Sequence, residues 1–334
     1  MGLTVAVTGP TGEIGRSAIR ALEGSDEVER IVGMARRPFD PAEHGWHKTT
    51  YRQGDMLDRA AVDALVAGAD VVLHLAFIIL EAADAHDVNV EGSRNVFHAA
   101  VAAGVPRLVY ASSVAAYGFH ADNPQPLTED VPARGTPTHP YSAQKAQLEA
   151  VLRTALEGGD TQAWVVRPCI VAGPDATMLI DAIPYTRMAG LLPGPVREAL
   201  GAVPLLKPVL PDPGIPLQLV HHDDVAEALR LCVLGRGTPG VYNLAATDEL
   251  RVRDIADALG WHAVPVPDVA VDATAELATR LPFLPPEARW MDTFRVPVIM
   301  DVTKALTELG WVPRHSALET LRQTVAGHRE AVGA

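Results

Sequence analysis

Apolar runs alternate with amphipathic segments through the first half of the chain. Most of the runs are short and almost continuously apolar, which is typical of parallel strands buried on both faces. The apolar runs lie at residues 3–7, 31–34, 71–76, 108–112 and 163–166, and a short strand-like segment lies at 51–53. Between them, apolar residues recur at helical spacing in 59–67, 89–102 and 141–156. The pattern predicts an α/β fold whose doubly wound parallel sheet has helices on both faces.

The pattern changes near Pro174, and eight prolines fall from Pro184 to Pro216. Proline interrupts helices and central strands, so this stretch predicts a smaller, Pro-rich substrate lobe. We expect a strand at 217–221 and a helix at 223–234 to return to the sheet. The later expected elements are a strand at 241–244, a helix capped near Thr247 or Asp254, and helices at 302–309 and 317–328. The predicted main domain is 1–173 plus about 216–245, and the predicted lobe is about 174–215 plus 246–334.

A glycine-rich turn, Thr8-Gly9-Pro10-Thr11-Gly12-Glu13-Ile14-Gly15, connects the first predicted strand to the first predicted helix. Glycine lets the backbone approach a phosphate closely, and a helix start offers free N–H groups and the positive end of its dipole. This order of elements predicts a Rossmann-type fold that binds the pyrophosphate of a dinucleotide; the alternative is a plain strand–helix turn. The predicted contacts are Gly9, Thr11, Gly12, Glu13, Ile14 and Gly15.

The composition is that of a folded protein, with 48% hydrophobic and 21% charged residues and a formal net charge of −13. The negative charge argues against nucleic-acid and anionic-membrane partners, because both would repel it. Cys169 and Cys232 form no CxxC motif, which favours a reducing compartment. The chain starts without the pattern of a secretory signal, and no apolar run is long enough to cross a bilayer. We therefore expect a cytoplasmic enzyme that acts on a small molecule.

Tyr141 and Lys145 lie four residues apart on a predicted helix, which places both on one face. A neighbouring ammonium group favours the phenolate of a tyrosine and lowers its pKa, which makes the phenol a proton shuttle. Taken alone, the pair also fits an ordinary amphipathic helix. Ser113 strengthens the chemical interpretation because it follows the strand at 108–112, at the edge where a parallel sheet binds its ligand. Its plain alternative is a turn residue at a strand end.

In this order, the glycine turn and these three residues resemble the extended short-chain dehydrogenase/reductase family, also called the NAD-dependent epimerase/dehydratase family. The resemblance covers nearly the whole chain and is weakest at about 175–215 and 262–295. Further matching runs are Gly54-Asp55-Met56-Leu57-Asp58, His74-Leu75-Ala76, Asn89-Val90-Glu91-Gly92-Ser93-Arg94-Asn95, Tyr110-Ala111-Ser112-Ser113, Tyr117-Gly118, Arg167-Pro168, Gly173-Pro174, His221-His222-Asp223-Asp224-Val225-Ala226, and Lys304 with Leu309-Gly310-Trp311.

The resemblance implies a catalytic triad of Ser113, Tyr141 and Lys145. Tyr141 would exchange a proton with the substrate hydroxyl while a hydride passes to or from the nicotinamide. Lys145 would also bind the nicotinamide ribose, and Ser113 would orient the substrate oxygen. The other implied cofactor contacts are Asp55 and Met56 at the adenine, Leu75 and Ala76 along the central path, and Pro168 beside the nicotinamide.

The end of the second predicted strand bears on the choice of cofactor. An acidic residue there would bind the adenosine ribose hydroxyls of NAD. The chain instead reads Ala35-Arg36-Arg37. Guanidinium groups match a 2′-phosphate in charge and geometry, so Arg36 and Arg37 predict NADP, with NAD as the second choice. The alternative is a solvated basic turn.

The run His221-His222-Asp223-Asp224 contains residue types that bind metals. No Cys or His cluster elsewhere in the sequence has the spacing to complete a metal site. We therefore expect no metal, and interpret the run as a strand end followed by a helix that Asp223 or Asp224 caps.

Departures from the family pattern narrow the reaction. Ser113 is followed by Val114 and Ala115, where dehydratases of the family carry an Asp-Glu pair, and Leu217 occupies the place of a diphosphate-binding arginine. The lobe's cations are scattered among apolar residues and prolines, which favours an apolar substrate over a diphosphate. These cations are Arg187, Arg197 and Lys207.

Three functions remain open from the sequence. The first is an NADP-dependent oxidoreductase for a carbonyl or secondary alcohol of a small, largely apolar metabolite. The second is a sugar or sugar-nucleotide epimerase with tightly bound cofactor, and the third is a non-catalytic dinucleotide sensor. Helices 89–102 and 141–156 carry alanine-rich faces, which predict a homodimer by resemblance to the family.

Overall fold

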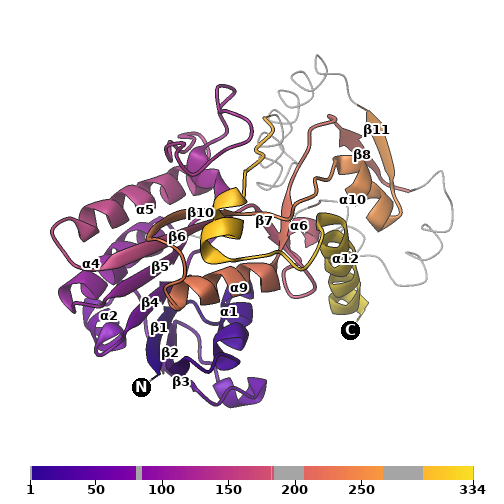
Figure 1. The fold of residues 1–334 in the computed structure, drawn as a ribbon. Helices are drawn as coiled ribbons and strands as arrows, with labels where there is room; N and C mark the ends of the chain where they lie inside the picture. The colour runs from indigo at the N-terminus through magenta and orange to yellow at the C-terminus, as the bar shows by residue number, and fades with distance from the viewer. Residues whose placement is uncertain (1, 80–84, 182, 184–206, 266–295, 334) are drawn as a thin grey trace.

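A computed structural model describes residues 2–79, 85–181, 183, 207–265 and 296–333 (Figure 1). Its centre is a seven-stranded parallel sheet in the order β10-β6-β5-β4-β1-β2-β3. The strands are β1 Leu3–Thr8, β2 Val28–Ala35, β3 Thr49–Gln53, β4 Val71–His74, β5 Arg107–Ala111, β6 Gln162–Pro168 and β10 Gly240–Leu244. The chain reverses its direction across the sheet between β1 and β4, and ligands bind at such a point beyond the carboxyl ends of the strands. The predicted Rossmann-type α/β fold is confirmed.

Helices cover both faces of this sheet (Figure 1). One face carries α1 (Glu13–Glu23) and α9 (His222–Val233), and the other carries α2 (Arg59–Val66), α4 (Ser93–Ala102) and α5 (Pro140–Leu156). Every residue of β4 is buried, as the near-continuous apolar strand pattern requires. Each large apolar side chain buried in this way contributes about 1.5–3 kcal/mol to folding.

A third hydrophobic cluster lies outside the main sheet and forms the centre of a smaller lobe. Its elements are β7 Ile170–Ala172, α6 Met178–Asp181, β8 Val209–Asp212, β9 Leu219–His221, α10 Val252–Leu259, β11 His262–Pro265 and α12 Ala317–Gly333. Here β7 pairs with β9 and β8 pairs with β11, both in parallel. In Figure 1 these elements lie together beside one end of the main sheet.

The expectation that residues 217–221 return to the main sheet is wrong. The strand β9 pairs with β7 in a separate two-stranded sheet. The residues on either side hold it there: Leu217 exchanges backbone hydrogen bonds with Leu250, and Ala246 donates to the Leu219 carbonyl. The helix that follows, α9, does pack beside α1 on the main sheet (Figure 1). The boundaries of the two domains stay a prediction.

The remaining described elements are short helical segments. They are 3-10 helices at Pro41–His44 and Val114–Tyr117, a short α-helix α3 at Ala85–Asp87, and π-helices at Val88–Gly92 and Ala305–Leu309. The expected helix at 89–102 therefore begins with a π turn before α4. Within the described ranges, no helix has the length and apolar character to span a membrane. The cytoplasmic location stays a prediction.

Candidate active site

The glycine turn between β1 and α1 has the close packing that a pyrophosphate site needs. Gly9 has φ +72°, and a Cβ there would lie 2.7 Å from the Ala76 Cα. A Cβ on Gly15 would overlap the Gly9 carbonyl oxygen, so α1 starts directly against the turn. The N-cap of α1 is Gly12, and no side chain caps the helix. The N–H groups at the start of α1 can therefore meet an anion, and the turn fits a dinucleotide.

The other predicted contacts of the turn, Thr11, Glu13 and Ile14, are half-buried at the start of α1. Thr11 accepts a hydrogen bond from the Arg16 guanidinium through its carbonyl oxygen, at 3.3 Å. Burial raises the pKa of the Glu13 carboxyl. The structure thus places all the predicted turn residues in one short segment, and their contacts with a cofactor stay predictions.

The end of β4 lies beside this turn. Leu75 donates its N–H to the Thr8 carbonyl at 3.2 Å, and Ala76 donates to the Thr8 hydroxyl at 3.4 Å. This places Leu75 and Ala76 at the switch point of the sheet, on the predicted path of the cofactor.

A buried histidine supports the same corner, and from the sequence it had a place only in the family-like run His74-Leu75-Ala76, with no predicted role. His74 is fully buried, and its ring nitrogens lie 2.6 Å from the Thr8 hydroxyl and 2.8 Å from the Ser93 hydroxyl. Burial lowers the pKa of His74 to about 3, with a smaller contribution from Lys145, so the ring is neutral. The available signal was a polar residue at the end of an otherwise apolar strand.

Ser113 and Tyr141 meet beyond the carboxyl end of β5. Ser113 caps the 3-10 helix Val114–Tyr117, where its hydroxyl accepts the Ala115 N–H at 3.2 Å. Tyr141 is the second residue of α5, after Pro140 at the first helical position, and it hydrogen-bonds Ser113. The Tyr141 ring packs edge-on against Phe77 with centroids 5.4 Å apart. Burial raises the pKa of Tyr141, and the hydrogen bond with Ser113 opposes that rise.

Lys145 lies one turn further along α5, buried beneath this pair. It is 3% exposed, and its ammonium donates to the Ala111 carbonyl at 2.8 Å. Its Nζ lies 4.1 Å from the Phe77 ring centroid and 5.9 Å from that of Tyr141. Burial lowers the pKa of Lys145 to about 7, and Glu149 partly opposes this.

The expected depression of the Tyr141 pKa by Lys145 is not what the structure shows. Burial dominates at both groups, because neither charged form is well solvated there. It raises the pKa of Tyr141 and lowers that of Lys145. The phenol therefore holds its proton at neutral pH.

A buried ion pair that the sequence reasoning did not include supports the floor of the site. Glu149 follows Lys145 by one helical turn and pairs with Arg167 at 2.5 Å. The Ser112 hydroxyl donates to the same carboxylate at 2.6 Å. Arg167 lies in β6 directly before Pro168, the predicted border of the nicotinamide site. The ion pair therefore connects α5 to β6, and the Ser112 hydroxyl adds a link to the end of β5. The available signal was the spacing of Glu149 from Lys145.

The predicted adenosine end lies at the other side of the switch point. Gly9 donates its N–H to the Met34 carbonyl at 3.1 Å, so the end of β2 adjoins the glycine turn. Arg36 and Arg37 follow β2 and are exposed. Met56 is buried in the same hydrophobic cluster as Met34 of β2. Its carbonyl accepts a hydrogen bond from the Asn95 side-chain amide at 3.0 Å.

The comparisons with known proteins agree with this arrangement. Residues 5–245 match the NAD dependent epimerase/dehydratase family. The chain belongs to this family. Its relatives include the UDP-glucose 4-epimerase of Azospirillum brasilense, 27% identical over 94% of this chain and 88% of that protein. Human 3 beta-hydroxysteroid dehydrogenase type 7 is 33% identical over 44% of this chain and 43% of that protein.

Among solved structures, the dTDP-glucose 4,6-dehydratase DesIV of Streptomyces venezuelae has the same fold. It has a TM-score of 0.73 and 23% identity, and the match covers 99% of this chain and 98% of that one. NAD is bound in that structure. The comparisons thus establish an NAD-dependent enzyme family and leave the reaction and substrate of this member open.

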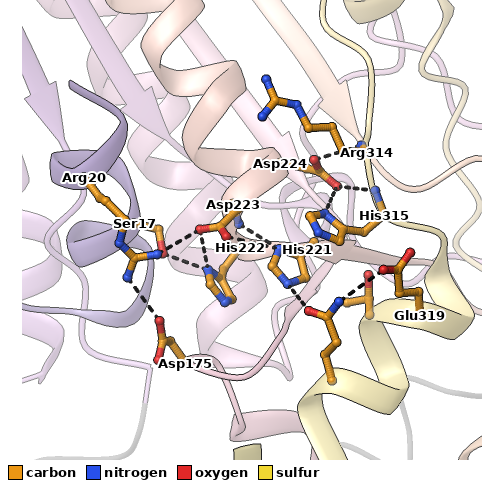
Figure 2. Close-up of polar contacts among 12 residues, drawn as sticks. Ser17, Arg20, Asp175, His221, His222, Asp223, Asp224, Arg314, His315 and Glu319 are labelled. Atoms are coloured by element: carbon orange, nitrogen blue, oxygen red, sulfur yellow. Dashed lines mark hydrogen bonds and ion pairs between the residues drawn. The ribbon is translucent and has the colours of Figure 1, made fainter. Parts of the chain in front are cut away.

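Within this family fold, the run from His221 to Asp224 joins β9 to α9 (Figure 2). The expectation that Asp223 or Asp224 caps α9 is wrong. The helix starts at His222, so the cap position belongs to His221, whose Nδ1 accepts the Asp223 N–H at 3.1 Å. Asp224 instead accepts the backbone N–H groups of Arg314 and His315, at 2.9 and 3.1 Å (Figure 2).

Three residues of the run also offer metal-binding atoms, since ligand atoms of His221, His222 and Asp223 lie within 4.8 Å of one another. Most of these groups already have partners in the structure (Figure 2), although His222 Nε2 is buried without a hydrogen-bond partner among the described residues. His222 Nδ1 lies 2.8 Å from the Ser17 hydroxyl, and Asp223 pairs with Arg20 at 3.3 Å. The hydrogen bond with His222 lowers the pKa of Asp223 to about 2. A metal ion would have to displace these bonds, so we interpret the run as a junction between α1, α9 and the lobe.

Proposed function

We propose that the protein is an NADP-dependent oxidoreductase that transfers a hydride between NADP(H) and a carbonyl or secondary alcohol of a small, largely apolar metabolite. The observation that carries the proposal is the hydrogen bond between Ser113 and Tyr141 above the buried Lys145. The site lies beyond the carboxyl end of β5, beside the glycine turn, where a sheet of this topology binds its ligand.

In the proposed mechanism each of the three residues has a separate role. A nicotinamide cofactor, when bound at this site, would supply or accept the hydride. During reduction, Tyr141 donates its phenolic proton to the substrate oxygen, which Ser113 holds by a hydrogen bond. An ammonium at Lys145 stabilises the phenolate that remains. Because the pKa of Lys145 is about 7, that ammonium is lost as the pH rises above neutrality.

Three observations argue against dehydration or a diphosphate substrate and in favour of an apolar one. Val114 and Ala115 follow Ser113, so no acid/base pair for dehydration stands next to the catalytic hydroxyl. Leu217 is 6% exposed within the hydrophobic cluster of the lobe, so no cation stands at this position to bind a diphosphate. Of the three cations expected in the lobe, Lys207 is half-buried, while Arg187 and Arg197 lie outside the described residues. The likeness to a steroid dehydrogenase over part of the chain supports the same substrate class.

Arg36 and Arg37 support NADP over NAD as the cofactor, although the related DesIV structure carries NAD. No acidic residue lies at the end of β2 to bind the two ribose hydroxyls of NAD. The exposed guanidinium groups can pair with a 2′-phosphate.

The second candidate is a sugar or sugar-nucleotide epimerase, which the likeness to UDP-glucose 4-epimerase over most of the chain favours. One experiment separates the two candidates. Purified protein is mixed with NADPH and tested with apolar ketones, aldehydes and sugar nucleotides. We expect NADPH to be consumed with an apolar carbonyl compound. Turnover of a sugar nucleotide without any net change in NADPH, on protein purified with bound cofactor, would favour the epimerase.

We also propose a homodimer that pairs through α4 and α5. The alanines of α4 do not support it, because Ala99 and Ala100 are buried in the core of the same subunit. The proposal relies instead on an open groove between the two helices, lined by His98, Ala150 and Val151 among others. Light scattering would test it, with a monomer as the contradicting result.

A further inference from the structure

The backbone that carries the two arginines is held by side chains of the neighbouring strand. The pairing of β2 with β3 ends at Ala35 and Gln53. Beyond that point, the Tyr51 hydroxyl reaches the Ala35 carbonyl at 2.8 Å and also the Arg37 carbonyl. The Gln53 side-chain amide donates to the Arg36 carbonyl at 2.9 Å. The Tyr51 hydroxyl and the Gln53 amide thus contact three consecutive carbonyl groups at and just beyond the end of the ladder, and the single Tyr51 proton is donated to one of its two carbonyls at a time.

Tyr51 is itself held in place by an aromatic cluster. Its ring lies 5.6 Å from that of Phe39, which stacks on His44 at 4.9 Å and contacts Trp46 at 5.5 Å. Trp46 is 9% exposed and belongs to the main core. Burial raises the pKa of Tyr51, so its hydroxyl remains a hydrogen-bond donor at physiological pH. The position of the hydroxyl is therefore set by the core.

A fixed backbone at Arg36 and Arg37 favours the binding of a phosphate by their side chains. A guanidinium binds a phosphate through a planar pair of hydrogen bonds, which needs a defined direction of approach. Long exposed side chains reach such a geometry more easily when their backbone is already fixed. Among the described residues, no carboxylate forms an ion pair with Arg37, so its charge is available to a ligand. NAD carries a hydroxyl in place of the 2′-phosphate, so its binding does not need this arginine geometry.

We propose that Tyr51 and Gln53 are positioning residues that set the preference for a 2′-phosphorylated dinucleotide by fixing the backbone of Arg36 and Arg37. The inference rests on the proposed NADP preference. It adds that the preference depends on two uncharged side chains of β3, neither of which needs to touch the cofactor.

The test compares Tyr51→Phe and Gln53→Met with wild type and with the control Tyr242→Phe. Tyr242 belongs to β10, at the opposite edge of the sheet from β3, and its hydroxyl likewise donates to a backbone carbonyl, that of Thr238 at 2.6 Å. Tyr242 is buried, whereas Tyr51 is half-buried. The dissociation constants of NADPH and NADH are measured for all four proteins by fluorescence titration at one salt concentration. The buffer contains no phosphate, which would compete with the 2′-phosphate for the arginine side chains.

We expect the ratio of the NADH to the NADPH dissociation constant to fall about fivefold in Tyr51→Phe, the size of one lost hydrogen bond, and less in the more exposed Gln53→Met. NADH binding should stay within about twofold of wild type, and Tyr242→Phe should keep the wild-type ratio. If Tyr51 and Gln53 only stabilised the fold, the substitutions would weaken the binding of NADPH and NADH equally and leave the ratio of the two dissociation constants unchanged.

An unchanged ratio in both β3 variants, with wild type still preferring NADPH, would overturn this inference and leave the proposed cofactor preference intact. A wild-type preference for NADH would overturn both. If Tyr51→Phe fails to fold, Gln53→Met decides the question, because Gln53 is exposed.

Discussion

The two ends of the proposed cofactor site differ in burial. At the nicotinamide end, Ser113 is 7% and Lys145 3% exposed, and burial shifts the pKa values of both Tyr141 and Lys145. At the adenosine end, Arg36 and Arg37 are exposed to water. Burial strengthens electrostatic interactions and shifts the pKa values of ionisable groups. Exposed charges are screened by water, and their main effect is on which ligand binds. Substitutions at the buried end should therefore alter chemistry and stability, and those at the exposed end should alter cofactor choice.

The largest effect is expected from removing the phenolic proton donor. Tyr141→Phe should lower kcat for NADPH-dependent carbonyl reduction by on the order of a thousandfold, because Tyr141 is the proton donor in the proposed mechanism. The dissociation constant of NADPH should change little, which titration of the same protein checks. A variant with wild-type kcat would remove Tyr141 from the mechanism.

The ion pair below the site should control both stability and the pH profile. Glu149→Gln leaves Arg167 buried without its partner and should cost about 3–5 kcal/mol in the free energy of unfolding. Since Glu149 raises the pKa of Lys145, its loss should also move the alkaline limb of activity to lower pH. Denaturant unfolding and a pH–kcat profile measure the two effects.

The matched control is Asp63→Asn, which breaks the exposed pair of Asp63 with Arg59 on α2. An exposed pair one helical turn apart contributes about 0.3–0.5 kcal/mol, so this variant should be close to wild type in both measurements. Equal losses in the two variants would show that the Glu149 pair has no special role.

The buried histidine should make the protein sensitive to acid. The pKa of His74 is about 3 in the folded protein, whereas an unburied histidine has a pKa of 6.5. Below pH 6.5 the unfolded chain therefore binds a proton at this residue that the folded chain does not bind. Stability from this group is complete above pH 6.5 and falls by up to about 1.4 kcal/mol per pH unit toward pH 3. His74→Gln should flatten that slope in urea unfolding, whereas the exposed His47→Gln should keep it. A wild-type slope in His74→Gln would contradict the assignment.

The smallest of these effects is expected at the exposed end. Arg37→Ala should weaken NADPH binding about tenfold through the loss of a charge-assisted hydrogen bond, and should leave NADH binding unchanged. Because the site is exposed, added salt should reduce the difference between wild type and variant. Equal weakening of NADPH and NADH would place Arg37 away from the 2′-phosphate.

The residues show why some features could be predicted from the sequence and others could not. The strand before Gly9 and the spacing of Tyr141 and Lys145 are local patterns, and each determines a local geometry. The pairing of β9 with β7 depends on contacts such as Leu217 with Leu250, which are far apart in the sequence. Burial likewise follows from tertiary packing, so the raised pKa of Tyr141 could not be read from its distance to Lys145 along the helix.

The polar networks illustrate the same limit. Glu149 stands at a visible helical spacing, but its partner Arg167 comes from β6 and follows it by 18 residues. The cap of α9 by His221 depends on where β9 ends, and a shift of one or two residues changes which side chain takes that position.

The central claim is net hydride transfer between NADP(H) and an apolar carbonyl compound. The most direct measurement uses NADPH that carries deuterium at the transferring position of its nicotinamide, with the best carbonyl substrate from the activity screen. We predict that deuterium appears on the new carbinol carbon in equal amount to the NADP formed, and that Tyr141→Phe slows both about a thousandfold. Conversion of a substrate to its epimer with no NADP formed and no deuterium incorporated would contradict the claim.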